Sequence, residues 1–209
     1  MKPAMIDVYG ANTSNSQRVA IMLEECAIPY LVHKVDLGAG EHRSDAFLAL
    51  NPVGAVPAMI DPKGPGGSAL TLSQSGAMLL YLAMKTGRFF PHDPTLRAVA
   101  FQWFMFASTD CASMSTMIFL NNAVVPERAA ANVAFFEDRV ARYFTVIDAR
   151  LESRRYLADE LTIADFALYP IVRVRYGLVE RGGDLPHLAR WADELAARPG
   201  VARGMAAFE

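Results

Sequence analysis

Hydrophobic positions recur along the first part of the chain in an order that predicts an α/β domain. Residues 5–9 and 31–35 are short apolar runs typical of strands. Between them, residues 19–26 carry apolar side chains at i, i+3, i+4 and i+7, the spacing of a helix, and Asn15 or Ser16 is expected to cap it. This pattern predicts a β-α-β unit with two parallel strands.

Two further strands and a last helix complete this domain. Residues 56–60 and 69–72 are strand-like and are separated by a stretch rich in Gly and Pro, which predicts an antiparallel hairpin. A loop and a short helix precede them. Helical spacing returns at Gln74 and ends at Gly87, a residue suited to terminate a helix. The predicted order over residues 1–87 is therefore β-α-β-α-β-β-α.

Residues 88–94 contain two prolines and show no hydrophobic periodicity, so they are predicted to be a linker. No strand pattern follows this linker. Everything beyond it, residues 95–209, is expected to form an all-α domain. The expected helices cover 95–122, 127–153, 163–181 and 187–197. Thr162 precedes the third of these helices and Asp165 lies in its first turn. This is the spacing of a reciprocal capping box.

Composition narrows the function classes. Hydrophobic residues make up 53% of the 209 residues, charged residues 20%, and the formal net charge is −2, which is typical of globular proteins and argues against nucleic-acid binding. The apolar runs are too short to span a membrane, so we expect a soluble, cytoplasmic protein. Cys26 and Cys111 have neither zinc-ligand nor dithiol spacing. We therefore expect no metal, and any thiol chemistry must use a thiol from a ligand.

Short polar side chains fill residues 12–16, between the first strand and the first helix. These residue types favour helix N-caps, which is the purely structural interpretation. The functional interpretation rests on the helix N-terminus, where free N–H groups and a partial positive charge stabilise a thiolate. A hydroxyl or amide in this loop would donate a further hydrogen bond to sulfur. A thiol bound here would be activated.

Two later segments are also candidates for ligand binding. Val56-Pro57 is compatible with a plain strand start, but a cis bond there would turn the Val56 N–H and C=O outward to pair with a peptide ligand. The sequence leaves the isomer open. Gln74 and Ser75 open a helix, where they either cap it or bind a ligand, with Ser75 contacting a carboxylate and Gln74 an ammonium group.

The order of these segments, together with L-T-I-A-D-F at residues 161–166, resembles the glutathione transferases over nearly the whole chain. Residues 13–15 and V-D-L-G at 35–38 are most similar to the nu-class bacterial enzymes, which are glutathione-dependent disulfide-bond reductases. The resemblance implies a thioredoxin-like first domain and glutathione as co-substrate. It also implies that Thr13 and Asn15 face the glutathione sulfur.

The resemblance further implies that glutathione lies extended along Val56 and Pro57, with its γ-glutamyl end at Gln74 and Ser75. Many relatives have a lysine before the V-P pair to bind the glycine carboxylate, but this chain has Ala55. The carboxylate contact is therefore expected from the loop before the second helix, at His42 or its neighbour Arg43.

Other departures leave the class open. Gln74 stands where most relatives have Glu or Asp, and Ser14 replaces a residue that is commonly Pro in the nu class. The same loop also resembles that of the zeta-class isomerases.

We expect disulfide reduction or conjugation to a small hydrophobic electrophile. The alternatives are glutathione-dependent isomerisation or dehalogenation, or a noncatalytic binding module of the same fold. The second substrate is expected against the first long helix of the second domain, around residues 103–117. The resemblance implies a homodimer, and no nucleic-acid or membrane partner is expected.

Overall fold

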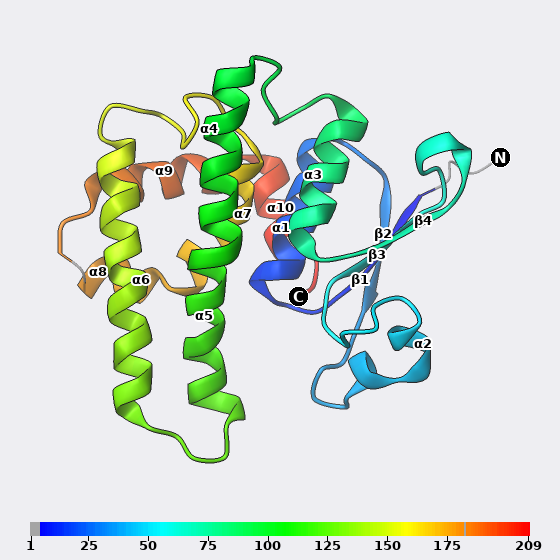
Figure 1. The fold of residues 1–209 in the computed structure, drawn as a ribbon, viewed down its shortest axis with the longest axis horizontal. Coiled ribbons are helices and arrows are strands. Elements are labelled where there is room, and N and C mark those ends of the chain that lie inside the picture. Colours follow the sequence, from blue (N-terminus) through cyan, green and yellow to red (C-terminus); the bar gives the residue numbers. More distant parts are fainter. Residues whose placement is uncertain (1–4, 182) are drawn as a thin grey trace. The chain divides into compact units, whose positions relative to one another are not determined.

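A four-stranded mixed sheet forms the centre of the first of two units in the computed structural model, which describes residues 5–181 and 183–209 (Figure 1). The first unit contains the described residues up to Arg88 together with Ala197–Glu209, and the second contains Phe89–Ala196. The strand order is β2-β1-β3-β4, with β1 parallel to β2 and antiparallel to β3, and β3 antiparallel to β4. This is the sheet predicted for a thioredoxin-like domain.

The elements of the first unit follow the predicted order. Their bounds are β1 Ile6–Gly10, α1 Ser14–Glu25, β2 Tyr30–Lys34, α2 Asp45–Leu48, β3 Ala58–Asp61, β4 Leu70–Ser73 and α3 Ser75–Thr86. The predicted cap of α1 at Asn15 or Ser16 is wrong, because Thr13 is the N-cap and both other residues lie in the first turn. A capping side chain reaches an N–H two or three residues ahead, and the Thr13 hydroxyl accepts from the Ser16 N–H.

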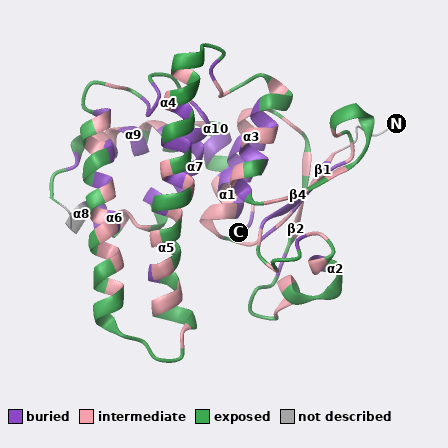
Figure 2. Ribbon diagram, viewed as in Figure 1, coloured by how far each residue is buried: buried purple, intermediate pink, exposed green. Residues whose placement is uncertain are grey.

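The core of the first unit lies on the side of the sheet that carries α1 and α3 (Figures 1 and 2). Val8 of β1, Met59 of β3 and Leu79 of α3 are fully buried. On the other face of the sheet, Phe47 of α2 packs with Ala58 in a smaller hydrophobic cluster. Alternate strand residues thus supply both faces of the sheet.

The helix α10 (Pro199–Ala206) packs along α1 within the first unit. Its glycines permit this contact: a Cβ at Gly204 would lie 2.4 Å from the backbone nitrogen of Ile21. Arg198, the residue before α10, pairs with the Glu25 carboxylate at 2.6 Å. The hydrophobic pattern predicts no helix here and places this stretch in the helical domain, whereas the structure groups it with the sheet.

The second unit is helical, as predicted. Its helices are α4 Pro94–Met105, α5 Ala112–Phe119, α6 Ala130–Leu151, α7 Ile163–Val174, α8 Tyr176–Arg181 and α9 Pro186–Ala196. α4 continues into α5 through a π-helical turn at Phe106–Cys111. Trp103 and Phe104, expected near the second substrate, are buried in this unit. Within the described ranges, no helix is long and apolar enough to cross a membrane.

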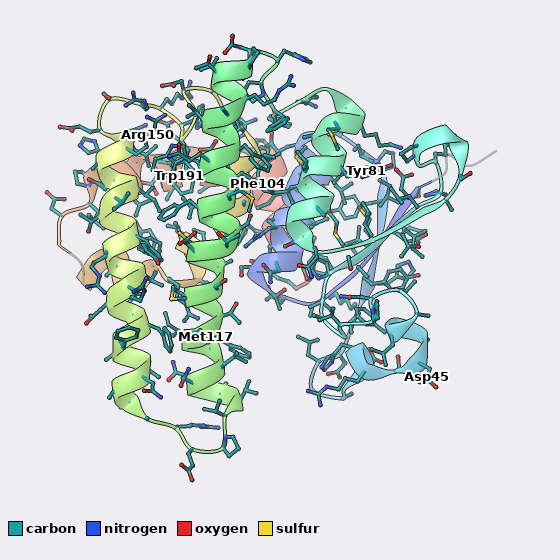
Figure 3. The ribbon with its side chains drawn as sticks, viewed as in Figure 1. Asp45, Tyr81, Phe104, Met117, Arg150 and Trp191 are labelled. Carbon is teal, nitrogen blue, oxygen red and sulfur yellow. The ribbon has the colours of Figure 1, made fainter. Side chains whose placement is uncertain are left out.

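A buried carboxylate organises the start of α7, where the predicted capping box is confirmed. Asp165 is fully buried, and its Oδ2 accepts from the Thr162 N–H at 3.0 Å and from the Thr162 hydroxyl at 3.3 Å. Its Oδ1 accepts from the Leu157 N–H at 3.2 Å and from Nε1 of Trp191 at 2.9 Å. Trp191 is labelled in Figure 3. Burial raises the pKa of Asp165 to about 6, although these hydrogen bonds oppose the rise.

Candidate active site

The three candidate segments meet at one end of the sheet of the first unit. Tyr9 near the end of β1 is paired with Ala58 at the start of β3, and Ala58 is paired with Ser73 at the end of β4. The polar loop that follows β1, the segment that precedes β3 and the start of α3 therefore leave the sheet at the same end. The topology brings together residues that lie more than sixty positions apart in the sequence.

A small hydrogen-bond network fixes the loop after β1. The Thr13 Oγ1 accepts from the Ser16 N–H at 3.2 Å and lies 3.0 Å from the Ser16 hydroxyl oxygen. That hydroxyl oxygen also accepts from the Ala11 N–H at 3.3 Å. Thr13 is half-buried and Ser16 is fully buried, so the Thr13 hydroxyl lies between the protein interior and the surface.

The first turn of α1 contains no acidic residue, so no side chain of the turn itself opposes the positive end of the helix dipole. Asn15 is half-buried in this turn, and its side chain has no hydrogen-bond partner among the described residues. A negatively charged ligand atom at this position could therefore accept hydrogen bonds from the amide and from the helix N–H groups.

The segment before β3 contains a cis peptide bond between Val56 and Pro57, the isomer that the sequence leaves open. The Val56 side chain packs against the cluster formed by Val35, Phe47 and Ala58. Within the described part of the chain, its backbone N–H and C=O have no hydrogen-bond partner. A half-buried backbone with unpaired polar groups suits the addition of an extended peptide.

Gln74 adopts a backbone conformation that side chains rarely take, with φ 71° and ψ 107°. It is exposed, occupies the N-cap of α3, and makes no capping hydrogen bond with its side chain. Ser75, the first residue of α3, is buried at 8% exposure, and the first turn has no acidic residue. Strained residues are concentrated at functional sites, so the conformation of Gln74 favours a role beyond capping.

His42 lies in a 3₁₀ turn (Glu41–Arg43) that contacts the same loop as Val56. A Cβ at Gly54 would lie 3.2 Å from the carbonyl oxygen of His42. The His42 ring is half-buried and its Nδ1 is buried without a hydrogen-bond partner among the described residues, which leaves Nε2 as the nitrogen available to a ligand. Arg43 is exposed.

Three other potentially reactive side chains have structural partners. Tyr9 stacks on His33 with ring centroids 4.4 Å apart, and His33 Nε2 lies 2.7 Å from the Asp7 carboxylate, an acidic partner that the sequence does not reveal. The Cys26 sulfur lies 3.6 Å from the Thr86 hydroxyl, and burial raises the pKa of the Cys26 thiol. A raised pKa disfavours the thiolate. In the described residues, no group of three or more His, Cys, Asp or Glu side chains could hold a metal ion.

Comparison with known proteins identifies the family of the chain. The family model described as "Glutathione S-transferase, N-terminal domain" matches residues 13–85, and "Glutathione S-transferase, C-terminal domain" matches residues 108–199. The curated protein "Disulfide-bond oxidoreductase YfcG" of Escherichia coli (strain K12) is 32% identical over 207 residues, covering 96% of this chain and 94% of that protein. The chain belongs to the glutathione S-transferase family.

Two solved structures resemble this family member closely. A glutathione transferase from Burkholderia graminis, with two glutathione molecules bound per subunit, has a TM-score of 0.89 and 35% identity, covering 97% of this chain and 88% of that one. One from Pseudomonas putida, with one glutathione disulfide bound per subunit, has a TM-score of 0.88 and 31% identity, covering 98% and 92%. The predicted resemblance is confirmed at the level of family and fold.

Three residues of this family member support the site in ways that its sequence does not predict. Asn51 is buried and bonds to both ends of the loop before Val56, donating to the Ala55 carbonyl and accepting from the Val53 N–H at 3.2 Å. For Ser16, the sequence predicts only a role as a helix cap. For Phe208, no local signal in the sequence links the residue to the start of α1.

Proposed function

We propose that this family member binds glutathione at the end of its sheet and uses the glutathione thiolate to reduce disulfides. The observation that carries this proposal is the N-terminus of α1, where Thr13 and Asn15 supply a hydroxyl and an amide and the first turn contains no acidic residue. The sulfur would lie at these two side chains. Hydrogen bonds to the thiolate and the helix dipole would both lower the pKa of the thiol.

The rest of glutathione would follow the other two segments. The unpaired backbone of Val56 would bind the cysteinyl part as an added strand, next to the cis bond to Pro57. The γ-glutamyl carboxylate would accept from the Ser75 hydroxyl and the N–H groups at the start of α3, and Gln74 would contact the ammonium group. His42 would bind the glycine carboxylate through Nε2, since Ala55 cannot.

The reaction consumes two glutathione molecules and one disulfide. The bound thiolate attacks one disulfide sulfur, the S–S bond breaks, and the released thiolate takes a proton from solvent. A second glutathione thiolate then attacks the glutathione sulfur of the mixed disulfide, which releases the other thiol and forms glutathione disulfide. The relatives support this choice, because one is named an oxidoreductase of disulfide bonds and two structures contain glutathione disulfide or two glutathione molecules per subunit.

Kinetics with a small test disulfide would examine the proposal directly. The reduction rate with glutathione should exceed the rate of conjugation to a chlorinated aromatic at the same protein concentration. Thr13→Val removes one hydrogen bond to a charged sulfur, worth about 1.5–3 kcal/mol, and should lower kcat/KM about tenfold to a hundredfold. The matched control is Thr145→Val on the exposed face of α6, which should keep the wild-type rate.

Two results would contradict this assignment. A conjugation rate equal to or above the reductase rate would favour a transferase, isomerase or dehalogenase. A folded protein that is not retained on immobilised glutathione would favour a noncatalytic module, an alternative that Ala55 and Gln74 keep open.

We also propose that the protein works as a cytoplasmic homodimer. Its glutathione-binding domain would be residues 1–87, completed by Ala197–Glu209, and its helical domain would be the remainder of residues 95–209. The support is the membership of the family, whose members are usually dimeric. Sedimentation equilibrium tests the oligomeric state, and a mass equal to that of one 22.9 kDa chain would contradict it.

A further inference from the structure

The Ser16 hydroxyl occupies a closed space beneath Thr13. Ser16 has no exposed surface. Its oxygen accepts from the Ala11 N–H at 3.3 Å and lies 3.0 Å from Thr13 Oγ1, and among the described residues these are its hydrogen-bond partners. A buried hydroxyl carries one proton, and buried polar protons in folded proteins are nearly always paired with an acceptor.

The closed space also restricts where the Ser16 proton can point. A Cβ at Gly10 would lie 2.9 Å from the Ser16 oxygen and 2.6 Å from Cε1 of Phe208, which is itself 5% exposed. Glycine at position 10 therefore leaves just enough room for both side chains. The acceptor that the network offers to the Ser16 proton is the oxygen of Thr13.

Two directions of the hydrogen bond between the hydroxyls are geometrically possible, and they differ in what they leave unpaired. If Thr13 donated to Ser16, the Ser16 proton would be buried without an acceptor. This arrangement would carry the desolvation penalty of an unpaired buried donor. If Ser16 donates to Thr13, both the Ser16 proton and the Ala11 N–H are satisfied. The second direction is therefore favoured.

We propose that Ser16 is a positioning residue that makes Thr13 an obligatory hydrogen-bond donor toward the bound sulfur; this inference rests on the proposed function. With Ser16 as donor, the Thr13 oxygen accepts two hydrogen bonds, one from the Ser16 N–H and one from the Ser16 hydroxyl. Both of its lone pairs are then occupied, and its own proton is free to point outward. Hydrogen bonds in such a chain also polarise one another, which strengthens the last one.

The role of Thr13 follows from this arrangement. An oxygen whose lone pairs are occupied cannot accept the thiol proton, so Thr13 stabilises the thiolate and does not act as a general base. The proton lost by glutathione passes to solvent. Ser16 would thus lower the pKa of the bound thiol without touching glutathione.

The test compares Ser16→Ala, Thr13→Val and the double variant. The pKa of the bound glutathione thiol is read from the ultraviolet absorption of the thiolate as the pH is varied. Ser16→Ala should raise that pKa by about 0.5–1 unit, the size of one neutral hydrogen bond, while the Kd for glutathione changes less than about twofold. In the Thr13→Val background, the same Ser16→Ala change should leave the pKa of the thiol unaltered.

Two further variants distinguish the loss of the Ser16 hydroxyl from a general destabilisation of the protein. Ser16→Gly also lacks the hydroxyl and should raise the pKa as Ser16→Ala does. Thr162→Ala removes another fully buried capping hydroxyl, in the second unit, and should leave the pKa of the bound thiol at the wild-type value even if the protein melts earlier.

The outcomes separate the inference from the proposed function. A wild-type protein that binds no glutathione, or binds it without lowering its thiol pKa, overturns both. If the wild type lowers that pKa, an unchanged pKa in Ser16→Ala overturns the inference alone. So does an equal rise in the pKa with and without the Thr13 hydroxyl, because Ser16 would then not act through Thr13.

Discussion

Replacing Asp165 with alanine removes the acceptor of three buried N–H groups at the start of α7. These donors are the backbone N–H groups of Thr162 and Leu157 and the indole N–H of Trp191. Each buried donor without an acceptor costs about 2 kcal/mol, so the loss is about 6 kcal/mol. In the wild type, the pKa of Asp165 is raised to about 6 from about 3.9. Keeping this carboxyl group ionised therefore already lowers the free energy of unfolding of the wild type by about 3 kcal/mol. The net expected destabilisation at pH 8 is about 3 kcal/mol.

Thermal unfolding followed by circular dichroism at pH 8 would measure this loss. For a protein of this size, about 3 kcal/mol corresponds to a fall in Tm of about 6–12 °C. The control is Asp148→Ala, which removes the acceptor of a single donor, the Leu188 N–H at 2.8 Å, at a half-buried position and should cost about 1 kcal/mol. A Tm for Asp165→Ala as close to wild type as that of the control would refute the reasoning.

The pH dependence supplies a second check on the same residue. Because the pKa of Asp165 is higher in the folded state than in the unfolded chain, the folded state binds more protons between about pH 4 and 6, and the contribution of Asp165 to stability falls as the pH rises through that range. The difference in Tm between wild type and Asp165→Ala should therefore be larger at pH 5 than at pH 8. A difference that shrinks at pH 5 would contradict the raised pKa.

Three further predictions concern the first unit. Burial alone would raise the pKa of Asp61, but hydrogen bonds from Lys85 and Tyr81 lower it. The stability that Asp61 contributes is therefore present above the ordinary pKa of a carboxyl group and is lost as the pH falls through the lowered pKa of the folded state. Asp61→Asn should lower Tm at pH 7 more than at pH 3, and equal losses would contradict this. Gln74→Gly relieves the strain of the positive φ and should raise the free energy of unfolding, measured in urea, by about 1 kcal/mol. The same variant should bind glutathione more weakly in calorimetry. If it gains stability without losing affinity, the strain at Gln74 has no role in glutathione binding. Phe208→Ala should raise the KM for glutathione several-fold, because its ring packs close to Gly10 at the start of the loop that carries Thr13. The far-ultraviolet circular dichroism should change little. An unchanged KM would show that this loop needs no support from the ring.

The order of elements in the first unit was predictable because its signals are local. Alternating apolar residues mark the strands, and Gly87 adopts the left-handed conformation expected at the end of α3. The helix α10 was missed for a physical reason. Gly200 and Gly204 lower helix propensity, yet they are the residues that allow close contact with α1, so the feature that weakens the local signal is the one that packing requires.

The candidate site was only partly predictable. The sequence and its resemblance identified the three segments, and the strand register explains why they lie at one end of the sheet. Several neighbouring residues could each cap α1, so the choice of Thr13 depends on the backbone path and not on residue type. The backbone strain at Gln74 and the pairing of His33 with Asp7 depend on the folded chain, and no local pattern reports them.

The position of Phe208 links the site to the order in which the chain is made. The loop that carries Thr13 leaves the ribosome early, but the ring that packs against Gly10 and beside Ser16 is translated almost two hundred residues later. Throughout synthesis, the thioredoxin-like unit therefore lacks α10 and one wall beneath its loop. A nascent chain would hold this loop in an incomplete setting, and the packing beneath it would be complete only when α10 lies against α1.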